Sequence, residues 1–161
     1  MMNLTKLFAM QKELDEYIAR LHPPEPGERR IYSKVLALLV EIGELANETR
    51  CFKFWSNKGP SSRETILEEA ADVLHFLLSI GNDIGANEDD IIIIPTKAIL
   101  LHRQFMMLYE YARLAHVKTM WKASLDVFAG LIEMLGFTQH ELEAAYMRKH
   151  AENYARQERG Y

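Results

Sequence analysis

Residues 66–80 read ILEEAADVLHFLLSI, and this segment decides the fold class of the chain. At about 3.6 residues per helical turn its polar side chains form one stripe, and the other positions are aliphatic or Phe. The stripe consists of Glu68, Glu69, Asp72, His75 and Ser79. A helix that is apolar over the rest of its surface belongs inside a bundle of helices. The segment therefore predicts an all-α protein.

The rest of the chain also carries mainly helical signals. Apolar positions recur with a helical period, and Ser61 with Glu64 and Thr138 with Glu141 match the capping box that opens a helix. The expected helices span about 4–21, 29–54, 62–82, 96–116, 119–135 and 139–158. The run Ile91–Ile94 is strand-like, but no partner strand is evident, so we expect a linker there. The expected fold is an all-α bundle of five or six helices.

Length and composition limit the classes of protein. The 161 residues suit a single domain, 1–161, with a substantial core. A net charge of −4 argues against a protein that binds a nucleic-acid backbone. The single cysteine, Cys51, excludes an internal disulfide and indicates a reducing compartment. No apolar run approaches the roughly 20 residues of a membrane span. We therefore expect a cytoplasmic protein without a membrane or nucleic-acid partner.

Two carboxylate pairs predict a metal site. Glu41 and Glu44 lie in one expected helix, and Glu69 and Asp72 lie in the next. Residues three apart face the same side of a helix, and both pairs have apolar neighbours, where carboxylates must be protonated, paired or bound to a cation. If the two antiparallel helices pack face to face, four carboxylates converge. Such an oxygen-rich site suits Mg²⁺ or Mn²⁺.

Other uses of these acids are less well supported. Each pair alone is typical of a solvated surface, and it is their combination that indicates a site. Di-iron bundles of the ferritin type need Glu-x-x-His motifs, and no Glu of this chain is followed by His three residues later. Iron chemistry is therefore disfavoured.

Residues near the acidic pairs would suit a nucleotide. The segment 47–58, NETRCFKFWSNK, combines aromatics, amides and cations, so that a base could stack on Trp55 and cations could meet phosphates. Phe52 and Phe54 are instead expected to close the bundle. His75 could reach the metal site or a base edge, although a lone histidine of this kind is more often a hydrogen-bonded core residue.

The last expected helix carries a second polar set. Lys149, Asn153 and Arg156 are spaced four and three apart, which places them along one face. A solvated helix surface explains the same pattern.

Taken together, these motifs resemble the dimeric, all-α dUTP diphosphatases, which belong to the wider MazG-like group of nucleotide pyrophosphohydrolases. The matching motifs are Glu41-x-x-Glu44, Asn47-Glu48-Thr49-Arg50-Cys51-Phe52-Lys53-x-Trp55-Ser56, Glu69-x-x-Asp72-x-x-His75-Phe76 and Lys149-x-x-x-Asn153-x-x-Arg156-Gln157-x-x-Gly160-Tyr161. The carboxylate pairs mark the wider group, and the Trp55 region and the C-terminal motif mark the dUTPase branch.

The resemblance implies a homodimeric enzyme that uses Mg²⁺ to hydrolyse dUTP to dUMP and pyrophosphate. It implies metal ligands at Glu41, Glu44, Glu69 and Asp72. It implies base or sugar contacts from Gln11, Trp55, His75 and Asn153, and phosphate contacts from Lys58, Lys149 and Arg156. For the group that orients or deprotonates the attacking water we favour Glu44, with Glu48 or Glu68 as alternatives.

Two other functions fit part of the sequence. A MazG-like pyrophosphohydrolase acting on another nucleoside triphosphate would share the metal site and differ in the base pocket. A non-catalytic bundle that binds a basic partner through its acidic stripe would show no stabilisation by cation and nucleotide.

Overall fold

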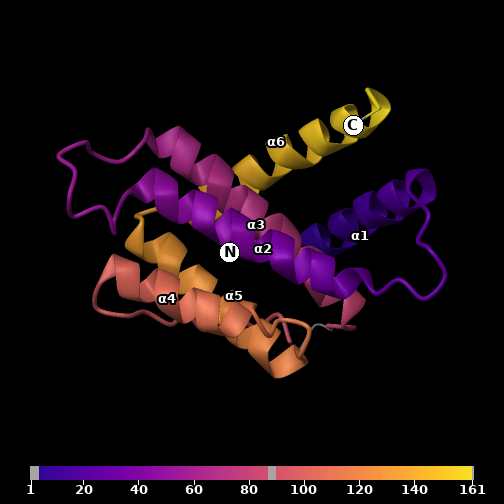
Figure 1. The fold of residues 1–161 in the computed structure, drawn as a ribbon, viewed down its shortest axis with the longest axis horizontal. Coiled ribbons are helices and arrows are strands. Elements are labelled where there is room, and N and C mark those ends of the chain that lie inside the picture. The colour runs from indigo at the N-terminus through magenta and orange to yellow at the C-terminus, as the bar shows by residue number, and fades with distance from the viewer. Residues whose placement is uncertain (1–3, 87–89, 161) are drawn as a thin grey trace.

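The computed structural model describes residues 4–86 and 90–160, in which six helices occur and no strand. Tyr161, part of the C-terminal motif, lies outside the described residues. The helices are α1 Leu4–Leu21, α2 Arg30–Thr49, α3 Arg63–Asp83, α4 Leu101–Ala112, α5 Lys118–Met134 and α6 Gln139–Glu158 (Figure 1). The prediction of an all-α bundle is confirmed.

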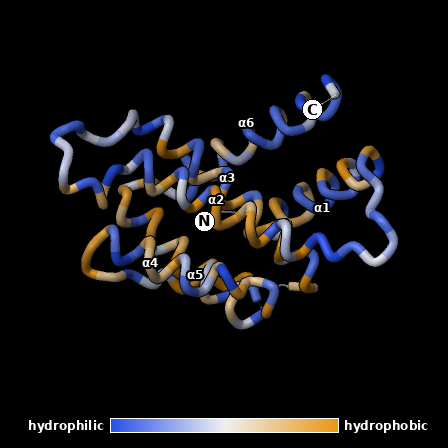
Figure 2. The backbone as a smooth tube through the Cα atoms, in the orientation of Figure 1, coloured by the Kyte–Doolittle hydropathy of each residue, from blue (hydrophilic) through white to orange (hydrophobic). Residues whose placement is uncertain are grey.

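Helix α3 is the centre of the bundle. It packs against α1, α2, α5 and α6, and α4 completes the structure by packing on α2 and α5. Figure 1 shows α2 and α3 side by side, with α4 and α5 on one side of them and α1 and α6 on the other. Hydrophobic positions concentrate where α2, α3, α4 and α5 meet, whereas α6 is largely hydrophilic (Figure 2). Within residues 4–86 and 90–160, none of the helices combines the length and hydrophobicity that crossing a bilayer requires.

Close packing on α3 depends on one small residue. A Cβ atom at Gly81 would lie 2.6 Å from the Trp121 ring and 2.7 Å from the Phe8 ring. Trp121 is fully buried, and its indole N–H donates to the carbonyl oxygen of Leu77 at 2.7 Å. Gly81 therefore lets α1 and α5 approach α3 closely enough to fill the core.

The helix starts differ in detail from the expectation. Thr138 and Glu141 form the predicted capping box of α6. The cap of α3 is Ser62 rather than Ser61, and its hydroxyl accepts from the backbone N–H of Thr65 at 3.1 Å. The expected box of Ser61 and Glu64 is therefore wrong by one residue. Ser61 instead donates its hydroxyl to Glu48 at the end of α2.

Helix α2 ends earlier than predicted. It stops at Thr49 because Arg50 adopts a left-handed conformation, with φ of 55°, and its N–H bonds to carbonyls of the last turn. The segment 50–62 is then a loop. Phe52 and Phe54 are 42% and 94% exposed, so the expectation that they close the bundle is wrong.

Helix α4 begins at Leu101 instead of about residue 96. The N–H of Thr96 donates to the backbone oxygen of Asp126 at 3.0 Å, and Gln104 donates to the oxygen of Thr96 at 2.8 Å. These bonds hold the chain before α4 against α5 in a non-helical form. Ile91–Ile94 belongs to neither a helix nor a strand, as expected of a linker.

Candidate active site

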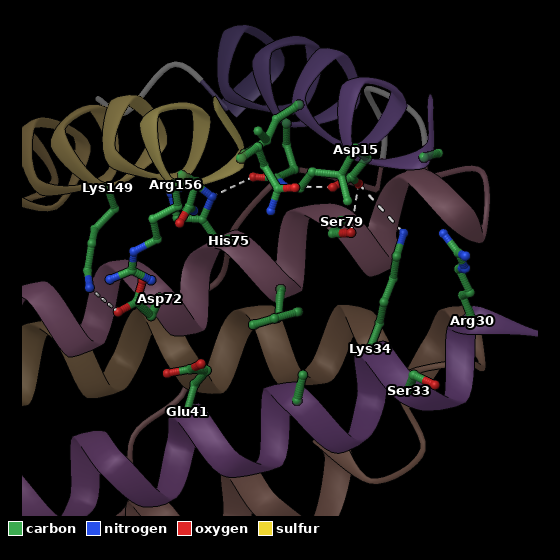
Figure 3. Close-up of a pocket in the computed structure, with 18 of the residues that line it drawn as sticks. Asp15, Arg30, Ser33, Lys34, Glu41, Asp72, His75, Ser79, Lys149 and Arg156 are labelled. Atoms are coloured by element: carbon green, nitrogen blue, oxygen red, sulfur yellow. Dashed lines mark hydrogen bonds and ion pairs between the residues drawn. The ribbon is translucent and has the colours of Figure 1, made fainter. Parts of the chain in front are cut away.

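A cleft of about 910 Å³ lies between α2 and α3 on one side and α1 and α6 on the other (Figure 3). All four helices contribute polar side chains to its lining. The site residues predicted from the sequence that line it are Gln11, Glu41, Glu44, Glu69, Asp72, His75, Lys149, Asn153 and Arg156. Residues far apart in the sequence therefore meet in one place.

One end of the cleft, which we call the acidic end, contains Glu41, Glu44, Glu69 and Asp72. One carboxylate oxygen from each of Glu41, Glu69 and Asp72 lies within 4.8 Å of the others. Glu44 is on the same face of α2 as Glu41, three residues further along. The face-to-face packing of α2 and α3 thus brings the two predicted pairs to the same end.

The electrostatics of the acidic end favour a cation. Burial is the main cause that raises the pKa of Glu41 to about 7, and repulsion from neighbouring carboxylates, first Asp72, adds to it. Burial also raises the pKa values of Glu69 and Asp72, even though a hydrogen bond from Lys149 opposes the rise at Asp72. Half-buried acids that repel one another are costly in the charged form, and a cation removes that cost. The donor set is all carboxylate oxygen, which fits hard ions such as Mg²⁺ and Mn²⁺.

Helix α6 brings cations to the same end. The ammonium of Lys149 lies 2.5 Å from a carboxylate oxygen of Asp72, and Figure 3 shows Lys149 and Arg156 extending toward Asp72. The start of α6 is attached to α3 by Arg63, whose guanidinium lies 2.8 Å from the carboxylate of Glu141 in the capping box. Arg63 therefore links the start of α6 to the start of α3.

The other part of the cleft, which we call the His75 end, is a chain of hydrogen bonds. Nδ1 of His75 lies 2.6 Å from Oε1 of Gln11, and the hydroxyl of Tyr146 donates to the same oxygen at 3.1 Å. The Tyr146 ring stacks on the imidazole at 4.1 Å between centroids. Burial lowers the pKa of His75 to about 3, so the ring is neutral at neutral pH.

Asp15 continues this chain toward α2. It accepts from the side-chain N–H of Gln11 at 2.9 Å and from the hydroxyl of Ser79 at 2.7 Å. The ammonium of Lys34 lies 3.6 Å from Asp15 and 2.7 Å from Asp83. The His75 end is therefore well paired, in contrast to the acidic end.

With this geometry established, comparison with known proteins identifies the family. A family model described as dUTPase matches residues 3–161. The chain belongs to the all-α dUTPase family. Hydrolysis of dUTP follows as its activity, since the match covers nearly the whole chain. No curated protein was found to match it.

Four residues that the sequence predicted for the site of this dUTPase do not line the cleft: Trp55, Lys58, Glu48 and the alternative base Glu68. Trp55 and Lys58 belong to the loop 50–62, where Trp55 is 64% exposed and packs edge-to-face on Phe54 at 5.0 Å between centroids. Glu48 lies at the last turn of α2, and its carboxylate accepts from the Ser61 hydroxyl. This hydrogen bond links the loop 50–62 to the end of α2.

The structure also places in the cleft residues that the sequence reasoning missed as site residues. They are Asp15 on α1, Ser33 and Lys34 on α2, and Ser79 on α3, all lining residues, together with Tyr146 behind His75. Asp15 follows Gln11 by four residues, and this spacing could have placed it on the same helical face. Lys34 carries no such signal, because its partners come from α1 and the end of α3.

Proposed function

We propose that this dUTPase converts dUTP to dUMP and pyrophosphate with Mg²⁺ bound at the acidic end, Mn²⁺ being the alternative ion. The proposed metal ligands are Glu41, Glu44, Glu69 and Asp72. The observation that carries the proposal is the convergence of oxygens from Glu41, Glu69 and Asp72 to within 4.8 Å of one another. Lys149 stands beside this cluster, where the phosphates of a bound nucleotide would meet it.

The chain's own groups suit hydrolysis of a phosphoanhydride. When bound, Mg²⁺ would neutralise phosphate charge and lower the pKa of a water. Lys149 and Arg156 would donate charge-assisted hydrogen bonds to phosphate oxygens. Glu44 lines the cleft, so we assign it to orienting and deprotonating the attacking water. We favour Glu44 over Glu48, since Glu48 is engaged with Ser61.

The base and sugar belong, in this proposal, to the His75 end. His75, Gln11 and Asn153 line the same cleft as the acidic end, and His75 lies about one helical turn along α3 from Asp72. Trp55 and Lys58 complete the proposed contacts, to the base and to a phosphate, when nucleotide is bound. The exposure of the Trp55 ring leaves it available for stacking.

We further propose a cytoplasmic homodimer built from a single domain, residues 1–161. One continuous hydrophobic core runs through the six helices, which supports a single domain. An apolar stripe on α2 supports the dimer: Tyr32, Leu36 and Val40, spaced four apart, are 49%, 64% and 50% exposed. A free cysteine, Cys51, agrees with a reducing compartment.

Pyrophosphate release from a panel of nucleoside triphosphates tests the function. We expect dUTP to be the best substrate with Mg²⁺ or Mn²⁺ and turnover to stop in EDTA. Preference for another base would favour the alternative of a MazG-like pyrophosphohydrolase with a different substrate. Full activity in EDTA would refute the proposed metal dependence.

Metal binding is tested separately by calorimetry with Mn²⁺. Glu69→Gln should abolish binding. Glu64→Gln is the matched control, because Glu64 lies in the first turn of α3, away from the cleft. Equal Mn²⁺ binding by the two variants would remove Glu69 from the site.

A further inference from the structure

The hydrogen bonds at the His75 end have a fixed direction. Asp15 accepts from Ser79, the ammonium of Lys34 lies nearby, and carboxylate oxygens facing such donors act as acceptors. The group of Gln11 that faces Asp15 at 2.9 Å must therefore be its NH₂. This turns the carbonyl oxygen of Gln11 toward His75.

The direction of Gln11 determines the protonation of His75. The carbonyl oxygen of Gln11 can only accept, and it already accepts from the Tyr146 hydroxyl at 3.1 Å. The nitrogen of His75 that faces it at 2.6 Å, Nδ1, must therefore carry the proton. In a neutral imidazole the other nitrogen, Nε2, is then a hydrogen-bond acceptor without a proton.

That acceptor has no partner of its own. His75 is 5% exposed, and its Nε2 is buried without a hydrogen bond among the described residues. His75 lines the cleft, and stacking on the fully buried Tyr146 holds its ring in place. A buried acceptor left unpaired is costly, so a base that donated an N–H to Nε2 would remove that cost.

We infer that Asp15, acting through Gln11, is a positioning residue that keeps His75 in its Nδ1–H tautomer, so that Nε2 selects bases presenting an N–H edge. Neither Asp15 nor its partners Ser79 and Lys34 need touch the substrate for this. Hydrogen bonds and an ion pair connect Lys34, Asp15, Gln11 and His75, and the hydroxyls of Ser79 and Tyr146 donate to members of this chain. The chain determines whether His75 accepts a hydrogen bond from the base or donates one to it.

This inference rests on the proposed function for the identity of the ligand. Uracil has a proton on N3, which Nε2 would accept. Cytosine in the same pose presents a lone pair at N3, so two acceptors would face each other, and both would lose their hydrogen bonds to water. Thymine shares the N3–H of uracil, so the tautomer separates imide bases from cytosine and does not separate uracil from thymine.

The variant Asp15→Asn should reverse the donor–acceptor direction of the hydrogen bonds from residue 15 to His75. Ser79 and Lys34 both donate, so the new amide keeps its oxygen toward them and turns its NH₂ toward Gln11. Gln11 then rotates to accept from it and presents its own NH₂ to Nδ1 of His75. Nδ1 becomes the acceptor and the proton moves to Nε2. The matched control is Asp83→Asn. Asp83 lies 2.7 Å from the ammonium of Lys34, so this variant also removes a carboxylate partner of Lys34, but it leaves the contact between Asp15 and Gln11 unchanged.

The first measurement is the ¹⁵N chemical shift of the His75 ring nitrogens in the full-length free enzyme, assigned by the loss of the signals in His75→Gln. We expect the Nδ1–H tautomer in the wild type and in Asp83→Asn, and a shift toward Nε2–H in Asp15→Asn. An Nε2–H tautomer in the wild type, or an unchanged one in Asp15→Asn, overturns the inference. Should Asp15→Asn fail to fold, Gln11→Met removes the oxygen facing Nδ1 and should likewise abolish the preference for the Nδ1–H tautomer.

The second measurement is the ratio of kcat/KM for dUTP to that for dCTP. Asp15→Asn should lower this ratio by about tenfold to a hundredfold, the effect of one mismatched hydrogen bond, and leave the ratio for dUTP to dTTP unchanged. An unchanged dUTP to dCTP ratio in a variant whose tautomer has moved refutes the role in base selection. If the wild type does not hydrolyse dUTP with Mg²⁺, the proposed function fails, while the chemical shifts still decide the tautomer.

Discussion

The two ends of the cleft differ in how their polar groups are satisfied. At the acidic end, carboxylates of like charge crowd together, and the pKa of Glu41 rises to about 7, chiefly through burial. At the His75 end, donors and acceptors alternate from Lys34 to Tyr146, and among the buried side-chain atoms that the structure describes there, Nε2 of His75 is left without a partner. The crowded carboxylates of the acidic end are thus costly in their charged form, whereas the polar groups of the His75 end are mostly paired with one another. Substitutions should therefore have opposite effects on stability at the two ends.

The largest effect is expected at the acidic end, from Asp72→Asn and Glu69→Gln. Each removes a proposed metal ligand, so turnover should fall on the order of 10³-fold. The fold should persist, since each substitution also removes a repelling charge. Pyrophosphate release with Mg²⁺ measures the first effect and thermal melting in EDTA the second. Wild-type turnover in either variant would end the metal assignment.

Trp55→Ala tests whether the exposed loop takes part in binding. Stacking of a base on an aromatic ring is worth roughly 1–3 kcal/mol, so KM for dUTP should rise by about one to two orders of magnitude with little change in kcat. Steady-state kinetics measure both constants. Ile99→Ala is the control, since Ile99 is 97% exposed, lies outside this loop and is not a predicted contact. Equal effects of the two changes would remove Trp55 from the binding site.

Glu41→Gln should stabilise the metal-free protein in a pH-dependent way. The pKa of Glu41 in the folded state, about 7, lies above its ordinary value of 4.5, so wild-type stability is lost as pH rises from 4.5 through 7. The glutamine variant avoids this loss. Because the carboxylate is half exposed, solvent screening reduces the gain above pH 7 to about 1–2 kcal/mol. Urea unfolding in EDTA measures it, and a gain that persists at pH 4.5 would contradict this origin.

Tyr146→Phe, at the His75 end, should destabilise the protein instead. The hydroxyl donates to Gln11 inside a buried chain, and its loss should cost about 1 kcal/mol of unfolding free energy. The cost is modest because Nδ1 of His75 still lies 2.6 Å from the same oxygen. Urea unfolding at neutral pH measures it. A higher unfolding free energy for Tyr146→Phe than for the wild type would contradict the expected opposite effects on stability at the two ends.

The sequence predicted the helical elements well and their ends less well. The apolar stripes of α2 and α3 and the capping box of α6 depend on neighbours within a few residues, so they could be recognised directly. The end of α2 depends on the left-handed conformation of Arg50, whose guanidinium also donates to Ser56 at 2.7 Å. The start of α4 depends on bonds from Thr96 to Asp126, thirty residues away.

The candidate site shows the same division. The spacing of Glu69 and Asp72 fixed their direction, and antiparallel packing then brought them to Glu41. The spacing of Asp15 from Gln11 could have placed it on the same helical face. Its contacts with Ser79, 64 residues away in the sequence, and with Lys34 across the cleft could not be predicted in that way.

By itself, the sequence determined the all-α class, the two acidic faces and the polar face of the last helix. All of these follow from helical periodicity, which acts over three or four residues. Only the tertiary structure decided that Trp55 stands outside the cleft of its own chain, that Asp72 meets Lys149, and that Gln11 holds His75. Those relations depend on how whole helices pack, and packing is set by the shape of the entire core rather than by any short segment.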